Sequence, residues 1–388
     1  MTPQPSVDLS PVWQVLLVGL LLATTALGWL WLRRRGKTRA SWLHGLTLLT
    51  LFLTFDLVVF GAFTRLTDSG LGCPDWPGCY GNASPVGAAA AISAAQSAMP
   101  SGPVTHSKAW IEMLHRYLAT GVGALILILA LANWRLRLAA SSSEQSPGVR
   151  WPMLTLLWVC FQGAFGALTV TMKLFPAIVT LHLLGGLVLL AMLAVQAEFQ
   201  DRRHSGRPLV WMVPTTRAVL LAAFGLLVLQ IALGGWVSTN YAVLACTDFP
   251  MCQNSWWPEM RFDQGFQLWR ELGLGKDGDP IAFAALTAIH VVHRMMAAAV
   301  LAALSLLAWR LSAIAPMRPA SRWIAALAVL QLATGLANAV LGWPLAAALL
   351  HTAGAAALVL VLTWALAASR AAAGGASVSR VTVLDLSA

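Results

Sequence analysis

The feature that most restricts the fold of this 388-residue chain is a series of apolar blocks, each about twenty or more residues long. A helix of this length crosses a hydrocarbon layer of roughly 30 Å. Charged residues make up only 10% of the chain, against about 25% in soluble domains. The blocks therefore predict an all-α polytopic membrane protein and argue against a water-soluble enzyme. Nine blocks qualify, at residues 12–32, 43–65, 109–132, 151–171, 177–197, 216–237, 282–308, 323–343 and 345–367.

The basic residues indicate how the chain crosses the membrane. Seventeen of the 25 Lys and Arg residues fall in the connections that follow the first, third, fifth, seventh and ninth blocks. Loops with such an excess face the cytoplasm. We therefore predict an outer N-terminus and a cytoplasmic C-terminus. The net charge of +10 then marks orientation in the lipid bilayer, and it does not predict a nucleic-acid partner.

The first block is predicted to be a retained anchor. Residues 1–11 carry no basic residue, and the apolar run that follows is longer than a typical signal-peptide core. The leader also lacks the Arg-rich character of a mitochondrial transit peptide. These features favour the cytoplasmic (inner) membrane of a bacterium.

Two segments that lie 173 residues apart share one pattern. Gly61 to Cys73 and Gly234 to Cys246 each end an apolar block and enter an outer loop. Blocks two to five therefore match blocks six to nine in the same orientation, which predicts two tandem four-helix bundles related by internal duplication. The predicted units are an N-terminal anchor with a basic loop (1–40), a first bundle (41–200), a second bundle (201–370) and a cytoplasmic tail (371–388).

Four of the five cysteines form Cys-x5-Cys pairs in the two outer loops. The outside of a bacterial membrane is oxidising, so Cys73 with Cys79 and Cys246 with Cys252 are predicted to form disulfides. A zinc site is the weaker alternative, because this spacing lacks the close cysteine pairs of zinc sites. Either a structural or a redox role is compatible with the sequence. The fifth, Cys160, is expected in the core.

Four histidines recur at matched positions near the outer ends of the blocks. These are His115 and His182 in the first bundle, and His293 and His351 in the second. Two helices of each bundle thus present one imidazole each at a common depth, which suits bis-histidine coordination of a haem iron. Histidines that serve only packing are the alternative. Because ionisable groups in a bilayer are costly, we favour metal ligation.

Charged residues accompany these histidines. Arg116 and Arg294 each follow one histidine directly and are predicted to pair with haem propionates, with lipid phosphate as the alternative partner. Glu112 precedes His115 by three residues, so it shares a helix face with that histidine. An acid beside an iron can move protons or stabilise positive charge.

The repeat differs at the position of Glu112. The second bundle has His290 there, which we expect to support His293 rather than bind the iron itself. Glu-x-x-His also occurs in di-iron bundles, but those need several inward carboxylates, and Asp56 is the main other acid in a block. Asp56 is compatible with a proton path or with a hydrogen-bonded strut.

With these residues in view, the chain resembles the haem A synthase family from residue 43 to about residue 368. The resemblance rests on Glu112-Met-Leu-His-Arg116, on the other three histidines, on the second cysteine pair and on the long motif Thr64-Arg-Leu-Thr-Asp-Ser-Gly-Leu-Gly-Cys-Pro-Asp-Trp-Pro-Gly-Cys-Tyr-Gly81. It implies a duplicated eight-helix protein that oxidises a methyl group of haem O to the formyl group of haem A, for terminal oxidase biogenesis. The first block is additional to that pattern.

The resemblance also implies a division of labour between the bundles. The first bundle would hold the substrate haem O with Glu112, His115 and His182, and the second would hold haem b through His293 and His351. Arg65, in the long motif, joins Arg116 and Arg294 as a candidate for haem binding. Haem O synthase and an electron acceptor are the expected partners.

Two other functions explain the paired histidines, namely a di-haem b-type electron carrier and a haem-transfer protein. Neither explains why Glu112 occurs in one bundle alone.

Two outer segments carry further expectations. The Ala/Ser-rich residues 82–101 are expected to be mobile. Phe262, Phe266, Trp269 and Leu272 approximate the stripe of an interfacial or buried helix.

Overall fold

The structure is a computed structural model that describes residues 10–139, 148–275 and 278–371. Within these ranges, nine helices are long and apolar enough to cross a membrane. All nine predicted blocks are thereby confirmed, and the chain is an all-α polytopic membrane protein. The helices are α1 (Ser10–Arg33), α2 (Arg39–Leu66), α4 (His106–Ala139), α5 (Arg150–Thr171), α6 (Pro176–Ser205), α7 (Pro214–Thr239), α9 (Phe283–Ser312), α10 (Arg318–Val340) and α11 (Leu345–Ala367).

Local sequence sets several of these helix ends. Pro176 and Pro214 stand in the first turns of α6 and α7, where a missing N–H costs nothing because those groups have no partner within a helix. Gly206 ends α6 in the left-handed conformation, with φ at 68°, which glycine adopts readily. The Thr38 hydroxyl caps α2 by accepting from the Ser41 N–H at 3.2 Å.

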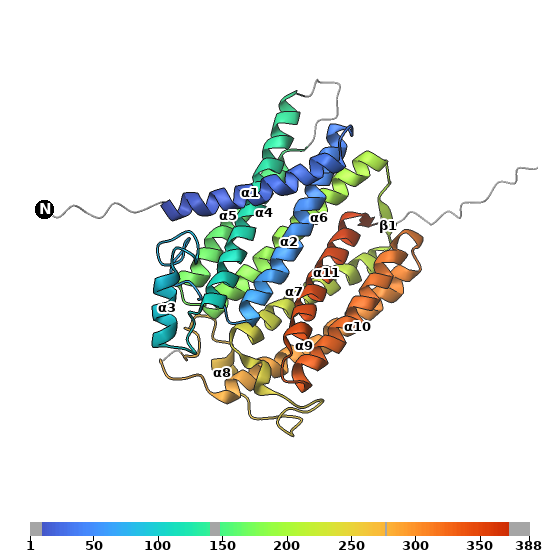
Figure 1. Cartoon of the computed structure of the whole chain (residues 1–388). Coiled ribbons are helices and arrows are strands. Elements are labelled where there is room, and N and C mark those ends of the chain that lie inside the picture. The colour runs from blue at the N-terminus through green and yellow to red at the C-terminus, as the bar shows by residue number, and fades with distance from the viewer. Residues whose placement is uncertain (1–9, 140–147, 276–277, 372–388) are drawn as a thin grey trace, which may run out of the picture.

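The eight long helices that follow α1 pack as two similar groups (Figure 1). In the first bundle α2 and α5 each contact both α4 and α6, and in the second α7 and α10 each contact both α9 and α11. Between the bundles, α2 packs on α11, α6 packs on α7, and α6 also contacts α11. The two groups therefore share one packing order, and the duplication itself stays a prediction.

Helix α1 stands outside these two groups and crosses α4, on which it packs (Figure 1). Gly19 makes the crossing possible, because a Cβ atom there would overlap the side chain of Thr120. At its N-terminal end, Val15 is buried in one cluster with Cys73 and Cys79. The additional helix therefore covers both α4 and the first disulfide loop.

The two ends of the molecule differ. The short helices α3 (Ala89–Ala98) and α8 (Phe262–Gly265) lie at one end with the disulfide loops, and β1 (Val210–Met212) lies at the other (Figure 1). There β1 pairs in parallel with β2 (Ser369–Ala371). The sequence did not predict these strands, which are too short to show a pattern. Residues 372–388 of the predicted tail lie outside the described residues.

Three expectations about individual segments were wrong. Residues 82–101 contain α3, and Ile92 of that helix is completely buried against the first disulfide loop. The predicted stripe at 262–272 is not one helix, because α8 ends at Gly265 and the chain then turns so that Arg270 is buried. Cys160 is exposed on α5 and is not part of the core.

Candidate functional site

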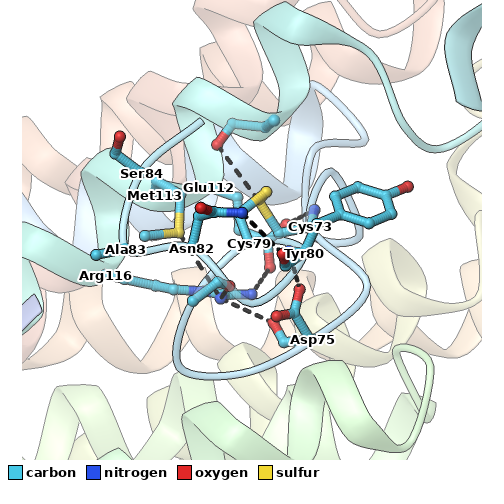
Figure 2. The surroundings of a disulfide bond; sticks show 12 residues. Cys73, Asp75, Cys79, Tyr80, Asn82, Ala83, Ser84, Glu112, Met113 and Arg116 are labelled. Carbon is cyan, nitrogen blue, oxygen red and sulfur yellow. Dashed lines mark hydrogen bonds and ion pairs between the residues drawn. A yellow bond between two sulfur atoms is a disulfide. The ribbon is translucent and has the colours of Figure 1, made fainter. Parts of the chain in front are cut away.

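The first disulfide loop is folded around the side chain of Asp75 (Figure 2). Cys73 and Cys79 are bonded, as predicted, and both are fully buried. Between them the Asp75 carboxylate accepts hydrogen bonds from the N–H groups of Tyr80, at 2.6 Å, and Gly81, at 2.8 Å. Bonded cysteines leave no thiolates for a metal, which removes the zinc alternative.

Arg116 joins this loop to α4 (Figure 2). Its Nη1 donates to the carbonyl oxygens of Asp75 at 2.9 Å, Pro77 at 3.2 Å and Gly78 at 2.5 Å. Its Nη2 forms an ion pair with Glu112. The Arg116 side chain is only 9% exposed, and its donors lie in the loop; the predicted pairing with a haem propionate stays a prediction.

The second loop repeats this construction with a different carboxylate. Cys246 and Cys252 are bonded, and Asp248 accepts from the N–H groups of Gln253, at 2.8 Å, and Asn254, at 2.9 Å. The backbone N–H of Asn254, with that of Gln253, holds the pKa of the Asp248 carboxyl below its usual value. Both loops therefore use one aspartate to bind two successive backbone N–H groups.

Arg294 fixes the second loop as Arg116 fixes the first. It donates to the carbonyl oxygens of Cys246 at 2.7 Å, Asp248 at 2.8 Å and Met251 at 3.0 Å. Its Nε also donates to Nε2 of His290, at 3.2 Å. His290 thus accepts a hydrogen bond from the arginine one turn further along its own helix.

Glu112 is held at both carboxylate oxygens. Oε2 accepts from the N–H of Cys73 at 2.8 Å, and Oε1 pairs with Arg116. The side chain is almost completely buried. The carboxylate is therefore linked directly to the backbone of a disulfide cysteine, an arrangement that the His290 position of the second bundle does not reproduce.

A glycine from a neighbouring helix stands beside each of the four histidines. A Cβ atom at Gly61 of α2 would lie 3.1 Å from Nε2 of His115, and one at Gly234 of α7 would lie 3.1 Å from Cε1 of His293. The corresponding distance is 3.5 Å for Gly166 with His182 and for Gly335 with His351. The absent side chains leave each imidazole room against the adjacent helix.

The helices that carry each histidine pair lie diagonally across their bundle. α4 and α6 both pack on α2 and α5, and α9 and α11 both pack on α7 and α10. Facing imidazoles on opposite helices are the geometry that two axial haem ligands require. Across the described ranges, no group of three or more His, Cys, Asp or Glu side chains is arranged to hold a metal ion. The described residues of each bundle thus supply two imidazoles, the donor set that a bis-histidine haem site would use.

Arg65 does not join the histidines. Its Nη2 donates to the carbonyl oxygen of Ser238 at 2.5 Å, and its guanidinium lies 4.2 Å from the centroid of the Tyr241 ring. The Tyr241 hydroxyl in turn donates to Asp68 at 2.5 Å. Arg65 therefore connects the two bundles. Asp56 is exposed on the surface of α2.

Sequence reasoning missed four polar residues at this end of the molecule. Asp75 and Asp248 had a signal, since both loops read Cys-x-Asp-aromatic-Pro-x-Cys. Gln230 and Thr334 had none, because a single glutamine or threonine in an apolar block does not reveal which side chain it faces. In the structure each contacts a histidine of the second bundle.

Several named proteins have sequences that are similar to this chain. The model of the COX15-CtaA family, described as cytochrome oxidase assembly protein, matches residues 44–363. A protein of Shewanella oneidensis named heme A synthase is 37% identical over 315 residues, which cover 81% of this chain and 92% of that protein. Another so named, from Rhizorhabdus wittichii, is 28% identical over 355 residues, covering 85% of this chain and 94% of that protein. The chain therefore belongs to the COX15-CtaA family of cytochrome oxidase assembly proteins.

Proposed function

We propose that this protein is a haem A synthase, an oxidoreductase that converts the methyl group of haem O to the formyl group of haem A. The observation that carries the proposal is an asymmetry within the repeat. Both bundles hold a diagonal pair of histidines, but among the described residues only the first bundle has a buried carboxylate, that of Glu112, three residues before one of the histidines on the same helix. The names of the relatives agree with this function.

In this proposal the first bundle binds the substrate. His115 and His182 hold the iron of haem O, and the glycines beside them leave space for the imidazoles. Oxidation of a methyl to a formyl group removes hydrogens from the carbon as protons and electrons and adds one oxygen atom from water or dioxygen. In this proposal the electrons pass to the electron acceptor or to dioxygen, and the buried carboxylate of Glu112 accepts a proton. The Cys73 N–H and Arg116 fix its carboxylate, so the proton acceptor is oriented before substrate binds.

The second bundle holds the resident cofactor. His293 and His351 are the ligands for haem b, which when bound supplies one-electron transfer. Arg294 fastens the second disulfide loop to the helix that carries His293. In this proposal Arg116 and Arg294 fix the two loops over the haem sites.

The membrane arrangement follows from the charges. We place the disulfide loops on the oxidising side of the bacterial inner membrane and the arginine-rich connections in the cytoplasm. The N-terminus is then outside and the C-terminus inside. Haem O synthase and an electron acceptor are the partners that the reaction requires.

The proposal is tested by producing the protein with a source of haem O and analysing the extracted haems by mass spectrometry. A haem A synthase yields the formyl product. A di-haem electron carrier or a haem-transfer protein would bind both haems and return haem O unchanged, and that result would reject the proposal.

A further inference from the structure

The histidine pairs of the two bundles differ in how their rings are held. We propose that Thr334, through Nδ1 of His351, and Gln230, through the ring and carbonyl oxygen of His293, fix the second-bundle histidines and make that haem site permanent, whereas their apolar counterparts leave the first site exchangeable. This inference rests on the proposed function and adds a physical reason for the division between cofactor and substrate. It concerns positioning residues, which act through the histidines.

Thr334 determines which nitrogen of His351 can bind iron. The Thr334 hydroxyl donates its single hydrogen to the carbonyl oxygen of Leu330 at 2.7 Å. Its oxygen also lies 2.9 Å from Nδ1 of His351, so in that contact it must be the acceptor. Nδ1 then carries the ring hydrogen, and the lone pair of Nε2 is free for the iron.

Gln230 contacts the other histidine of the pair, His293. Its amide nitrogen lies 3.1 Å from Nδ1 and 3.3 Å from Nε2 of the ring, and it donates to the carbonyl oxygen of His293 at 3.3 Å. The Gln230 amide therefore holds both the ring and the backbone of His293 against α7.

The first bundle lacks both groups. The repeat matches Gln230 to Leu57 and Thr334 to Phe165. Accordingly, Nδ1 of His182 is buried without a hydrogen-bond partner among the described residues. The His115 ring stacks on Phe60, with 6.2 Å between centroids and an angle of 8°, and its described neighbours donate no hydrogen bond to it.

The difference has a direct consequence for haem exchange. A ring held at Nδ1 keeps one tautomer and one orientation, and the hydrogen bond makes Nε2 a stronger donor to iron. Loss of such a partner typically weakens metal binding by about 10- to 100-fold. A substrate haem must leave after reaction, so rings without this support suit the first bundle.

The test measures haem retention in the purified full-length protein loaded with haem. Transfer to excess apomyoglobin gives a dissociation rate for each bound haem, and redox titration gives the midpoint potential of haem b. Gln230→Leu and Thr334→Val should each release haem b about 10-fold faster than wild type and shift its potential. Thr334→Ser, which keeps the hydroxyl, should restore both values.

The matched control is Thr352→Val, because the Thr352 hydroxyl bonds the Ala348 carbonyl at 3.2 Å within its own helix. The converse variant, Leu57→Gln with Phe165→Thr, should slow release from the first bundle. Haem b release unchanged from that of Thr352→Val would overturn the inference. Wild type that binds no haem b would instead contradict the proposed function.

Discussion

Arg65 donates a hydrogen bond to the main-chain oxygen of Ser238, the residue at its own matched position in the second bundle. The neighbouring bond from Tyr241 to Asp68 likewise joins two matched positions, 173 residues apart. In a two-fold arrangement, equivalent residues touch each other only near the axis. We therefore infer that these four residues lie near the axis of the predicted duplication.

Arg65→Ala should destabilise this junction. A hydrogen bond from a charged donor contributes about 1.5–3 kcal/mol, and a cation–π contact about 0.5–2 kcal/mol. We expect a lower thermal midpoint in detergent, measured by circular dichroism. Arg261→Ala removes an arginine whose pair with Asp263 is exposed, and it should change the midpoint little. Equal midpoints for the two variants would show that Arg65 does not hold the bundles together.

Glu112→Gln separates the charge of this residue from its structural contacts. The amide oxygen can still accept from the Cys73 N–H, but the side chain no longer takes up a proton. We expect the variant, like Glu112→Ala, to retain bound haem and to stop at haem O or a hydroxylated intermediate, as measured by mass spectrometry of extracted haems. Glu198→Gln is the control, because Glu198 is also a buried glutamate and pairs with Arg202 on its own helix. Normal haem A production by Glu112→Gln would remove the carboxylate from the mechanism.

The two loop arginines offer a crossed experiment. Lysine lacks the planar guanidinium that donates to three carbonyl oxygens. Arg116→Lys should therefore make the first disulfide loop open more often, and Arg294→Lys should do the same for the second. All four disulfide cysteines are buried, and reduction requires opening of the loop. If the free energy that keeps the loop closed falls by about 1.4 kcal/mol, dithiothreitol should reduce the disulfide about tenfold faster. The rate is measured by maleimide trapping and peptide mass spectrometry. Arg116→Lys should accelerate Cys73–Cys79 alone, and equal acceleration of both disulfides would count against separate control.

Helix α1 depends on its close crossing with α4. Gly19→Leu places a side chain where Thr120 already lies, and such overpacking costs about 1–3 kcal/mol. We expect a lower thermal midpoint in detergent. Gly28→Leu on the same helix meets open space and should leave the midpoint near that of wild type. If both variants behave alike, α1 is not fixed at Gly19.

Features that depend on local sequence were predictable. The nine membrane helices follow from runs of apolar residues, and the two disulfides follow from paired cysteines in matched outer loops. Helix α3 was missed because its Ala/Ser-rich sequence resembles a loop, and only the burial of Ile92 shows why it is ordered.

The roles of individual polar side chains were less accessible. Arg116 follows a candidate haem ligand, so a propionate was the natural expectation, and the sequence did not reveal that its donors reach loop carbonyls some forty residues earlier in the chain. The contact of Gln230 with His293 spans 63 residues. Such pairings depend on how helices are rotated against each other, which an apolar block alone does not specify.

The central claim is that the two bundles hold different haems, and a matched pair of ligand variants tests it most directly. His182→Ala and His351→Ala alter equivalent positions, and the haems that remain bound to each purified protein are identified after extraction. We predict that His182→Ala keeps haem b and lacks haem O, while His351→Ala keeps haem O and lacks haem b with its low-spin spectrum. Loss of the same haem from both variants, or an unchanged spectrum in His351→Ala, would contradict the account.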